Sequence, residues 1–246
     1  MLRILLAAWK PMTLVHSWKL PDGYDAVVKV MTTIKDTPRN RIEVDELDST
    51  FTYIWVENLG TKTGLSIAAN LVHSVDAYIL RAMHRRCNYD PQVVGYADQC
   101  LESELIGRSL YGQPDAVTVD SFMDKKIAYY IEQYNRSGLA DAVILPHLNQ
   151  SNVTCLSQAH LKALSKMVNE MLAYQPFELV TVHDEFRAHV NNLNHVRQNY
   201  VNIMAELAES KVLNDLLSQL YEKPVSFTKL STNLPTLIRS SAYALC

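Results

Sequence analysis

The chain has 246 residues, of which 48% are hydrophobic and 20% are charged, and its formal net charge is −3. This length is enough to bury one sizeable hydrophobic core or two small ones. With seven glycines and nine prolines, the composition argues against a disordered chain. A free-standing DNA- or RNA-binding domain usually carries a basic excess, which this chain lacks. Nucleic-acid contacts would therefore come from local basic patches or from a partner chain.

The cysteines and the N-terminal apolar stretch exclude further classes of protein. The chain has four cysteines, without a CxxC pair or a regular spacing: Cys87, Cys100, Cys155 and Cys246. This pattern argues against a zinc knuckle or a disulfide framework, and it fits a reducing compartment. The apolar residues 2–9 are far fewer than the roughly 20 residues of a membrane span. We therefore expect no membrane contact and a cytoplasmic location.

The first quarter of the chain predicts a helix end followed by β-structure. Residues 1–12 are typical of the end of a helix, which Pro11 stops. Residues 13–58 combine β-branched and aromatic runs with a turn at 21–23 and a polar tip at 35–41. We expect strands on both sides of that tip.

A long helix is predicted over residues 63–87, with Thr61 and Thr63 as candidate N-caps. Its apolar stripe has helical spacing and comprises Ala68, Leu71, Val72, Val75, Ile79, Ala82 and Met83. Asn70, His73, Ala77, Arg81 and His84 occupy the opposite face.

Residues 88–156 have the least regular pattern. They predict two or three helices, with 101–110 and 119–134 as the best candidates, and a loop at 149–154 that is rich in Asn, Gln and Ser.

The last third of the chain predicts a helix, a strand and more helix. The helix runs from Ser157, its candidate N-cap, to about Tyr174. Residues 177–183 form an apolar, β-branched strand, and a helical pattern over 193–220 ends before Pro224.

His183 and Asp184 lie at the end of the predicted strand. A strand that leads into an Asp holds the carboxylate rigidly at the edge of a sheet, where it can bind a metal ion. Because side chains alternate along a strand, the two residues point in opposite directions and would not ligate one metal together. Asp184 is therefore the candidate metal ligand, and His183 supports the turn or contacts the substrate. On the local pattern alone, a surface turn with an acidic residue is the favoured interpretation.

His73 and Asp76 are three residues apart on the predicted helix 63–87, so they are neighbours on its surface. Arg81 and Arg85 extend the same side by further turns. A His with several Arg on one helix face suits contact with phosphates and base edges. Without more context, the solvated face of an amphipathic helix is the favoured interpretation.

Taken in order, these segments resemble the single-subunit DNA-directed RNA polymerases of bacteriophages and mitochondria. Residues 67–76 look like that family's PNFVHSxD helix, and residues 182–184 resemble its palm motif C. Residues 15–24 are similar to the stretch that enters the promoter-specificity hairpin. Residues 184–201 continue as the family does after motif C, and residues 241–246 resemble its C-terminal foot. Five such segments in the family's order are more specific than any one of them.

The resemblance implies an α+β fold that is the C-terminal part of a right-handed polymerase, with palm and fingers elements. The implied parts are the end of a fingers or palm helix (1–12), a region similar to the promoter-specificity loop (13–58), the HSxD-type helix (63–87), a helical insertion atypical of the family (88–156), the palm with a motif C strand-turn-strand and its following helix (157–222), and a foot-like tail (223–246).

The resemblance also implies the chemistry, which is template-directed NTP polymerisation with two Mg²⁺ ions. Asp184 would be a metal ligand, and His183 would brace motif C near the RNA 3′ end. His73, with Asn70 and Arg81, would contact the RNA 3′ end and the newest base pair.

The basic residues at the polar tip are expected near DNA, by comparison with the specificity hairpin. These residues are Lys35, Arg39 and Arg41. A solvated hairpin tip is the ordinary alternative.

In this family, motif A, which carries the other metal-binding Asp, and motif B precede the specificity hairpin. No stretch before Pro21 fits either motif, so we expect the C-terminal, motif C-bearing subunit of a split, heterodimeric phage RNA polymerase. A second polypeptide would supply motifs A and B and the other Asp. The DNA template, RNA product and NTPs are the further expected partners, and an accessory DNA-loading protein is another candidate. The expected location is the cytoplasm of the infected bacterial host.

Three alternatives remain open. A fragment of an A-family DNA polymerase would fit residues 182–185 equally well, but its helix carries a Gln-Gly-Ser/Thr-Ala-Ala-Asp type of run, unlike residues 70–74. An HD-type metal phosphohydrolase needs its His-Asp pair on a helix, whereas residues 183 and 184 end a predicted strand. A non-catalytic assembly subunit that keeps the fold is the third alternative.

Overall fold

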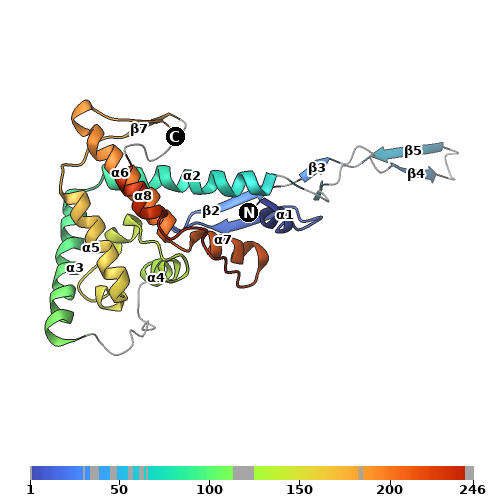
Figure 1. Ribbon diagram of the computed structural model, residues 1–246. Helices are drawn as coiled ribbons and strands as arrows, with labels where there is room; N and C mark the ends of the chain where they lie inside the picture. Colours follow the sequence, from blue (N-terminus) through green and yellow to red (C-terminus); the bar gives the residue numbers. More distant parts are fainter. Residues whose placement is uncertain are drawn as a thin grey trace. The chain divides into compact units, whose positions relative to one another are not determined.

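The computed structural model describes residues 2–29, 31–33, 39–44, 49–54, 58–60, 64, 66–112, 125–182 and 185–241. The chain forms two compact units. We call Met1–Trp18 with Asp25–His73 the N-terminal unit, and Lys19–Tyr24 with Ser74–Cys246 the helical unit. Helices and short paired strands both occur (Figure 1), so the fold is of the expected α+β class.

The N-terminal unit is mainly β-structure. Its elements are α1 (Leu2–Ala7), β1 (Val15–Lys19), β2 (Asp25–Lys29), β3 (Met31–Thr33), β4 (Arg39–Val44), β5 (Ser49–Ile54), β6 (Asn58–Gly60) and the start of α2 (Ser66–Cys87). The strands form two-stranded sheets, in which β1 pairs with β2, β3 with antiparallel β6, and β4 with antiparallel β5. The β-structure predicted over 13–58 is confirmed where residues are described.

Two tryptophans and a histidine form the small core of the N-terminal unit. Trp18, His16 and Trp9 are buried, and the rings of Trp9 and His16 lie 4.6 Å apart. Burial lowers the pKa of His16. Gly60 is required here because a Cβ at this position would lie 2.4 Å from the carbonyl carbon of Met12.

The helical unit contains most of the helices. After α2, its elements are α3 (Pro91–Tyr111), α4 (Lys125–Ser137), η2 (Ala142–His147), η3 (Val153–Cys155), α5 (Gln158–Leu172), β7 (Val180–Val182), β8 (Glu185–Arg187), η4 (Val190–Asn192), α6 (Leu193–Glu209), α7 (Val212–Tyr221) and α8 (Leu234–Ser240). Helix α3 packs along α5, and α6 along α8 (Figure 1). Helix α4 packs against α7.

The main hydrophobic core of this unit joins α3, α4, η2 and α5. Its fully buried members include Leu101, Ile127, Leu156, Leu161 and Leu164. Residues 88–156, expected to be a helical insertion, are helical where described and supply much of this core. They therefore stabilise the unit itself, because α5, which follows them, buries its apolar face against them.

Side-chain caps begin α3 and α5. The Asp90 carboxylate accepts a hydrogen bond from the Gln92 amide at 2.8 Å, and Pro91 occupies the first helical position. The predicted N-cap Ser157 accepts a hydrogen bond from the His160 amide at 3.2 Å. The predicted N-cap of α5 is thus confirmed, whereas α3 begins at Pro91, before the helix predicted over 101–110.

Three details differ from the sequence-based expectations. Val72, placed on the apolar stripe of α2, is 58% exposed, and Tyr78 is buried instead. Of the strand expected over 177–183, residues 177–179 are not strand, Val180–Val182 form β7, and residue 183 lies outside the described residues. The region expected to be a short tail contains α8, which packs on α6.

In the part of the chain that is described, no helix is both long enough and apolar enough to cross a membrane.

Candidate functional site

The predicted strand-turn-strand around His183 and Asp184 has antiparallel strands on both sides. Val182 at the end of β7 pairs with Glu185 at the start of β8, and Val180 pairs with Arg187. His183 and Asp184 themselves lie outside the described residues. The strands on both sides of the predicted turn are therefore present. The geometry of the proposed metal ligand, Asp184, is not described.

The hairpin is exposed on its apolar side. Val180 is 52% exposed and Val182 is 43% exposed, and among the described residues β7 and β8 pair with each other alone. A two-stranded hairpin is marginally stable in water unless another element covers it. Among the described residues, no further strand covers the hairpin.

Glu185 and Arg187 form an ion pair on one side of β8. The Arg187 Nε and Nη2 donate to the Glu185 carboxylate oxygens at 3.0 and 2.9 Å. This hydrogen bonding lowers the pKa of Glu185. Both side chains are more than half exposed, so the Glu185 carboxylate is occupied but remains accessible to solvent.

Helix α2 presents the two predicted nucleic-acid contacts that lie in the N-terminal unit. His73 is exposed and Asn70 is half-buried. They lie three positions apart on one helix, so they are neighbours on its surface. A contact with nucleic acid requires this kind of accessibility.

Arg81 is placed differently, because its guanidinium is held by the protein. Its Nε donates to the Asp22 carboxylate at 2.6 Å and its Nη2 at 3.0 Å. The guanidinium also lies over the Tyr24 ring, 4.3 Å from its centroid. A nucleic-acid contact through Arg81 would have to compete with this paired arrangement.

Arg85 links the turn that carries Asp22 to a second buried carboxylate. Its Nη2 lies 3.2 Å from Asp22 Oδ2 and 2.8 Å from Asp141 Oδ2. The Asp141 carboxylate also caps η2 by accepting a hydrogen bond from the Val143 amide at 2.8 Å. Burial alone would raise the pKa of Asp141, but Arg85 and these hydrogen bonds lower it below its ordinary value. The network holds residues 19–24 against α2 and η2.

A second buried polar cluster lies around the end of α2, and it was not predicted from the sequence. The buried Arg86 pairs with Glu206, and the Tyr174 hydroxyl donates to the Arg86 carbonyl at 2.9 Å. Asn199 donates to the Tyr174 hydroxyl at 2.6 Å. Burial raises the pKa of Tyr174 to about 12. No sequence signal marks these residues, since polar side chains are usually exposed.

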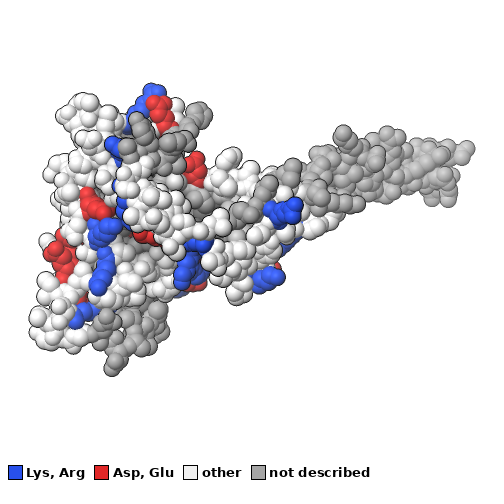
Figure 2. All heavy atoms as spheres, in the orientation of Figure 1, with Lys and Arg blue, Asp and Glu red and all other residues white. Residues whose placement is uncertain are grey.

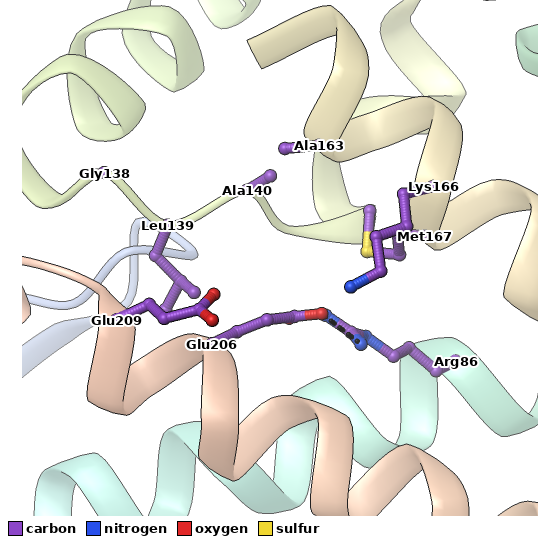
Figure 3. A pocket seen from close by; sticks show the side chains of 9 residues that line it. All are labelled: Arg86, Gly138, Leu139, Ala140, Ala163, Lys166, Met167, Glu206 and Glu209. Carbon is purple, nitrogen blue, oxygen red and sulfur yellow. Dashed lines mark hydrogen bonds and ion pairs between the residues drawn. The ribbon is translucent and has the colours of Figure 1, made fainter. Parts of the chain in front are cut away.

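One pocket of the helical unit is lined by several charged side chains (Figure 3). It has a volume of about 160 Å³ and lies beside Arg86, Lys166, Glu206 and Glu209. Figure 3 shows Arg86 and Glu206 paired along one side of it, with the Lys166 amine pointing inward. Glu209 accepts a hydrogen bond from Arg239 at 3.1 Å. Because each carboxylate already has an arginine partner, the pocket is best explained as a structural connection of α2, α5, α6 and α8.

The predicted DNA-contacting residues fall in a sparsely described part of the N-terminal unit. Arg39 and Arg41 lie in β4, two positions apart, opposite Ile54 and Thr52 of β5. Lys35 lies outside the described residues. On the face shown in Figure 2, acidic and basic side chains are interspersed over the described helical unit. This mixture agrees with the composition, which lacks a basic excess.

The described residues contain no group of three His, Cys, Asp or Glu side chains that could hold a metal ion. The proposed ligand Asp184 is outside that set. No family model matches the chain, and no curated protein matches it either.

Proposed function

We propose that this chain is a subunit of a DNA-dependent RNA polymerase of the single-subunit type, split between two polypeptides. The observation that carries the proposal is the hairpin of β7 and β8, in which His183 and Asp184 connect two antiparallel strands. This arrangement suits a palm motif C. The order of the HSxD-type helix, the hairpin and helix α6 along the chain gives further support.

In this proposal the chain contributes Asp184, and its partner contributes the second metal-binding Asp. The two Mg²⁺ ions would neutralise charge on the phosphates during in-line attack by the RNA 3′ hydroxyl. Asp184 would hold one side of this metal site, and His183 would brace the turn. His73 would contact the newest base pair from α2, where its exposure allows such a contact.

The remaining expectations belong to the same proposal. Residues 22–56 would correspond to the specificity hairpin, with Lys35, Arg39 and Arg41 near DNA. The complex would act in the cytoplasm of an infected bacterial host, on a DNA template with NTPs.

Exposed apolar side chains around the hairpin support the need for a partner subunit. They are Val180 (52% exposed), Val182 (43%), Val190 (71%) and Leu193 (45%). They occupy β7, η4 and the first residue of α6, before and after the proposed motif C turn in the sequence. Several exposed apolar side chains within a short stretch of chain are the kind of surface that a partner would cover. A partner strand beside the hairpin would also satisfy its open edges.

The alternatives are separated by specific observations. An HD-type phosphohydrolase is disfavoured because strands lie on both sides of His183 and Asp184. An A-family DNA polymerase fragment would share the hairpin, but it would incorporate deoxynucleotides. A non-catalytic subunit would tolerate the loss of the Asp184 carboxylate.

The proposal is tested by combining the chain with a polypeptide that carries motifs A and B, sought first in the neighbouring reading frame. The complex is incubated with a primed template, Mg²⁺ and either NTPs or dNTPs. We expect RNA synthesis by the complex and none by either chain alone. Robust extension by the isolated chain would contradict the split arrangement, and a preference for dNTPs would support the DNA polymerase alternative.

A further inference from the structure

A hollow of about 360 Å³ lies at the base of the β7–β8 hairpin. Its lining comes from the segment before β7, from β7 and β8, and from the segment after β8 that ends with η4: Phe177, Glu178, Val180, Arg187, Ala188, His189 and Asn192. Arg187 pairs with Val180 at the open end of the hairpin, two residue pairs away from Val182 and Glu185, which flank the turn. The hollow is therefore close to the proposed catalytic turn but separate from it.

Three hydrogen-bonding side chains face this hollow. Arg187 offers a planar, charged fork that suits a phosphate. His189 accepts a hydrogen bond from the Asn191 amide at its Nδ1, so its proton is on Nε2 when the ring is neutral. Asn192 makes no side-chain capping bond to α6. All three can donate to an oxygen-rich ligand.

An aromatic wall completes the lining. Phe177 is half-buried, and its ring lies 5.7 Å from that of Tyr174. An aromatic ring and an arginine that line one hollow suit single-stranded nucleic acid, because a base can stack on the ring while the cation contacts the backbone.

Two carboxylates near the hollow oppose the binding of an anion. Glu178 lines the hollow and Glu185 pairs with Arg187. The pair is exposed, with 61% of the Arg187 side chain and 57% of the Glu185 side chain accessible. Exposed ion pairs are weak, so a phosphate can displace Glu185 from the arginine. Glu185 is then a competitor of the ligand.

We infer that this hollow binds a segment of single-stranded nucleic acid, with a phosphate on Arg187 and a base against Phe177. The choice of nucleic acid as the occupant rests on the proposed polymerase function. The contact would hold a strand that passes the catalytic turn, and Arg187 would act as a binding residue.

The test measures binding of the full-length chain to a fluorescent RNA oligonucleotide by anisotropy, without Mg²⁺ or NTPs and over a range of salt concentrations. Arg187→Ala should weaken binding about tenfold, the effect of losing a hydrogen bond to a charged group. It should also reduce the slope of log affinity against log salt by about 0.7, the value for one phosphate contact on a single strand. Glu185→Gln should tighten binding, because it removes the competing carboxylate. Lys162→Ala, which removes an exposed cation from α5, is the matched control and should change neither quantity.

The opposite signs expected for Arg187→Ala and Glu185→Gln separate binding from a structural role. If the ion pair merely stabilised the hairpin, both variants would weaken binding, and this result would overturn the inference. Equal effects of Arg187→Ala and Lys162→Ala would overturn it as well, by indicating non-specific attraction. A DNA strand of the same sequence and a duplex serve as further ligands, and equal Arg187-dependent binding of the duplex would contradict the single-strand assignment.

Failure of this inference can be distinguished from failure of the proposed polymerase function. If the two-chain complex synthesises RNA while Arg187→Ala leaves the salt slope unchanged, the hollow is misassigned and the polymerase proposal stands. If the binding variants behave as expected and no complex extends RNA, the hollow stands and the polymerase proposal fails.

Discussion

The Nε of Arg85 lies 2.7 Å from Oδ1 of Asp141, and only 23% and 4% of the two side chains are exposed. The same guanidinium reaches Asp22, whose side chain is 3% exposed. One cation thus serves two buried carboxylates. Removing a buried partner leaves an uncompensated charge, which is more costly than removing an exposed one.

This arrangement predicts unequal effects at two neighbouring arginines. Arg85→Met should lower the free energy of unfolding by about 3–5 kcal/mol, because Asp141 loses its counterion. Arg81→Met should cost roughly 1 kcal/mol, since Arg85 still contacts Asp22 and Arg81 is partly exposed. Urea unfolding followed by circular dichroism measures both. Equal losses would contradict the assignment of Arg85 as the shared cation.

His160 predicts a pH dependence of stability. It is buried, stacks on Tyr134 with ring centroids 3.8 Å apart, and burial lowers its pKa to about 3. The unfolded chain takes up a proton as the pH falls below roughly 6.5, whereas the folded chain does not until about 3. The folded state is therefore fully stable with respect to this group above about pH 6.5. Between about pH 6.5 and about pH 3 the free energy of unfolding falls by about 1.4 kcal/mol for each pH unit.

The matched variant for this prediction is His160→Phe, which keeps a stacking ring and cannot titrate. Between pH 7 and pH 5 the wild-type protein should lose about 2 kcal/mol more unfolding free energy than the variant. Parallel pH profiles of the two proteins would show that His160 is not buried in its neutral form.

The glycines of the helical unit should respond to alanine in opposite ways. A Cβ at Gly95 or Gly107 of α3 would meet no atom within 4 Å. Each alanine should stabilise the protein by about 0.5–1 kcal/mol through its helix preference. At Gly23, φ is +82° and a Cβ would lie 2.7 Å from Cε1 of Tyr129, so alanine should lower the melting temperature. A stabilising Gly23→Ala would contradict the described turn.

His73→Ala tests the predicted contact of α2 with nucleic acid. Because His73 is exposed, its removal should leave stability unchanged. In the two-chain enzyme it should reduce kcat/KM for extension on the order of fivefold to tenfold, the worth of one hydrogen bond. His84→Ala, further along the same helix, is the control and should have no such effect. Similar losses for both variants would indicate a general effect on the helix.

Elements with strong local signals could be predicted from the sequence. Ser157 marks the start of α5, and an apolar stripe predicts α2. The exposure of Val72 could not be predicted, because the burying face of a helix depends on what packs against it. The separation of α6 from α7 depends on a distant contact, in which the Lys211 amide donates to the Ser137 carbonyl at 2.6 Å. Tertiary contacts of this kind leave no local pattern.

The candidate site could be predicted only where a chemically suitable side chain stands in a recognisable local sequence pattern. The hairpin around Asp184 follows from an apolar strand that leads into a turn. The engagement of Arg81 by Asp22 could not be foreseen, since the two residues are 59 positions apart. A basic residue on a polar helix face has the same sequence pattern whether it faces solvent or a buried carboxylate.

The most direct test of the polymerase proposal is the rate of RNA extension by the two-chain enzyme with Asp184→Asn. Asn keeps the size of Asp but lacks the negative charge that would position Mg²⁺. We expect kcat to fall at least roughly 10²–10³-fold, by comparison with the loss of one oxyanion-hole donor, while assembly and template binding stay intact. Glu185→Gln, whose expected effect is on RNA affinity, should leave kcat nearly unchanged. Near wild-type turnover by Asp184→Asn in the assembled enzyme would contradict the assignment of motif C.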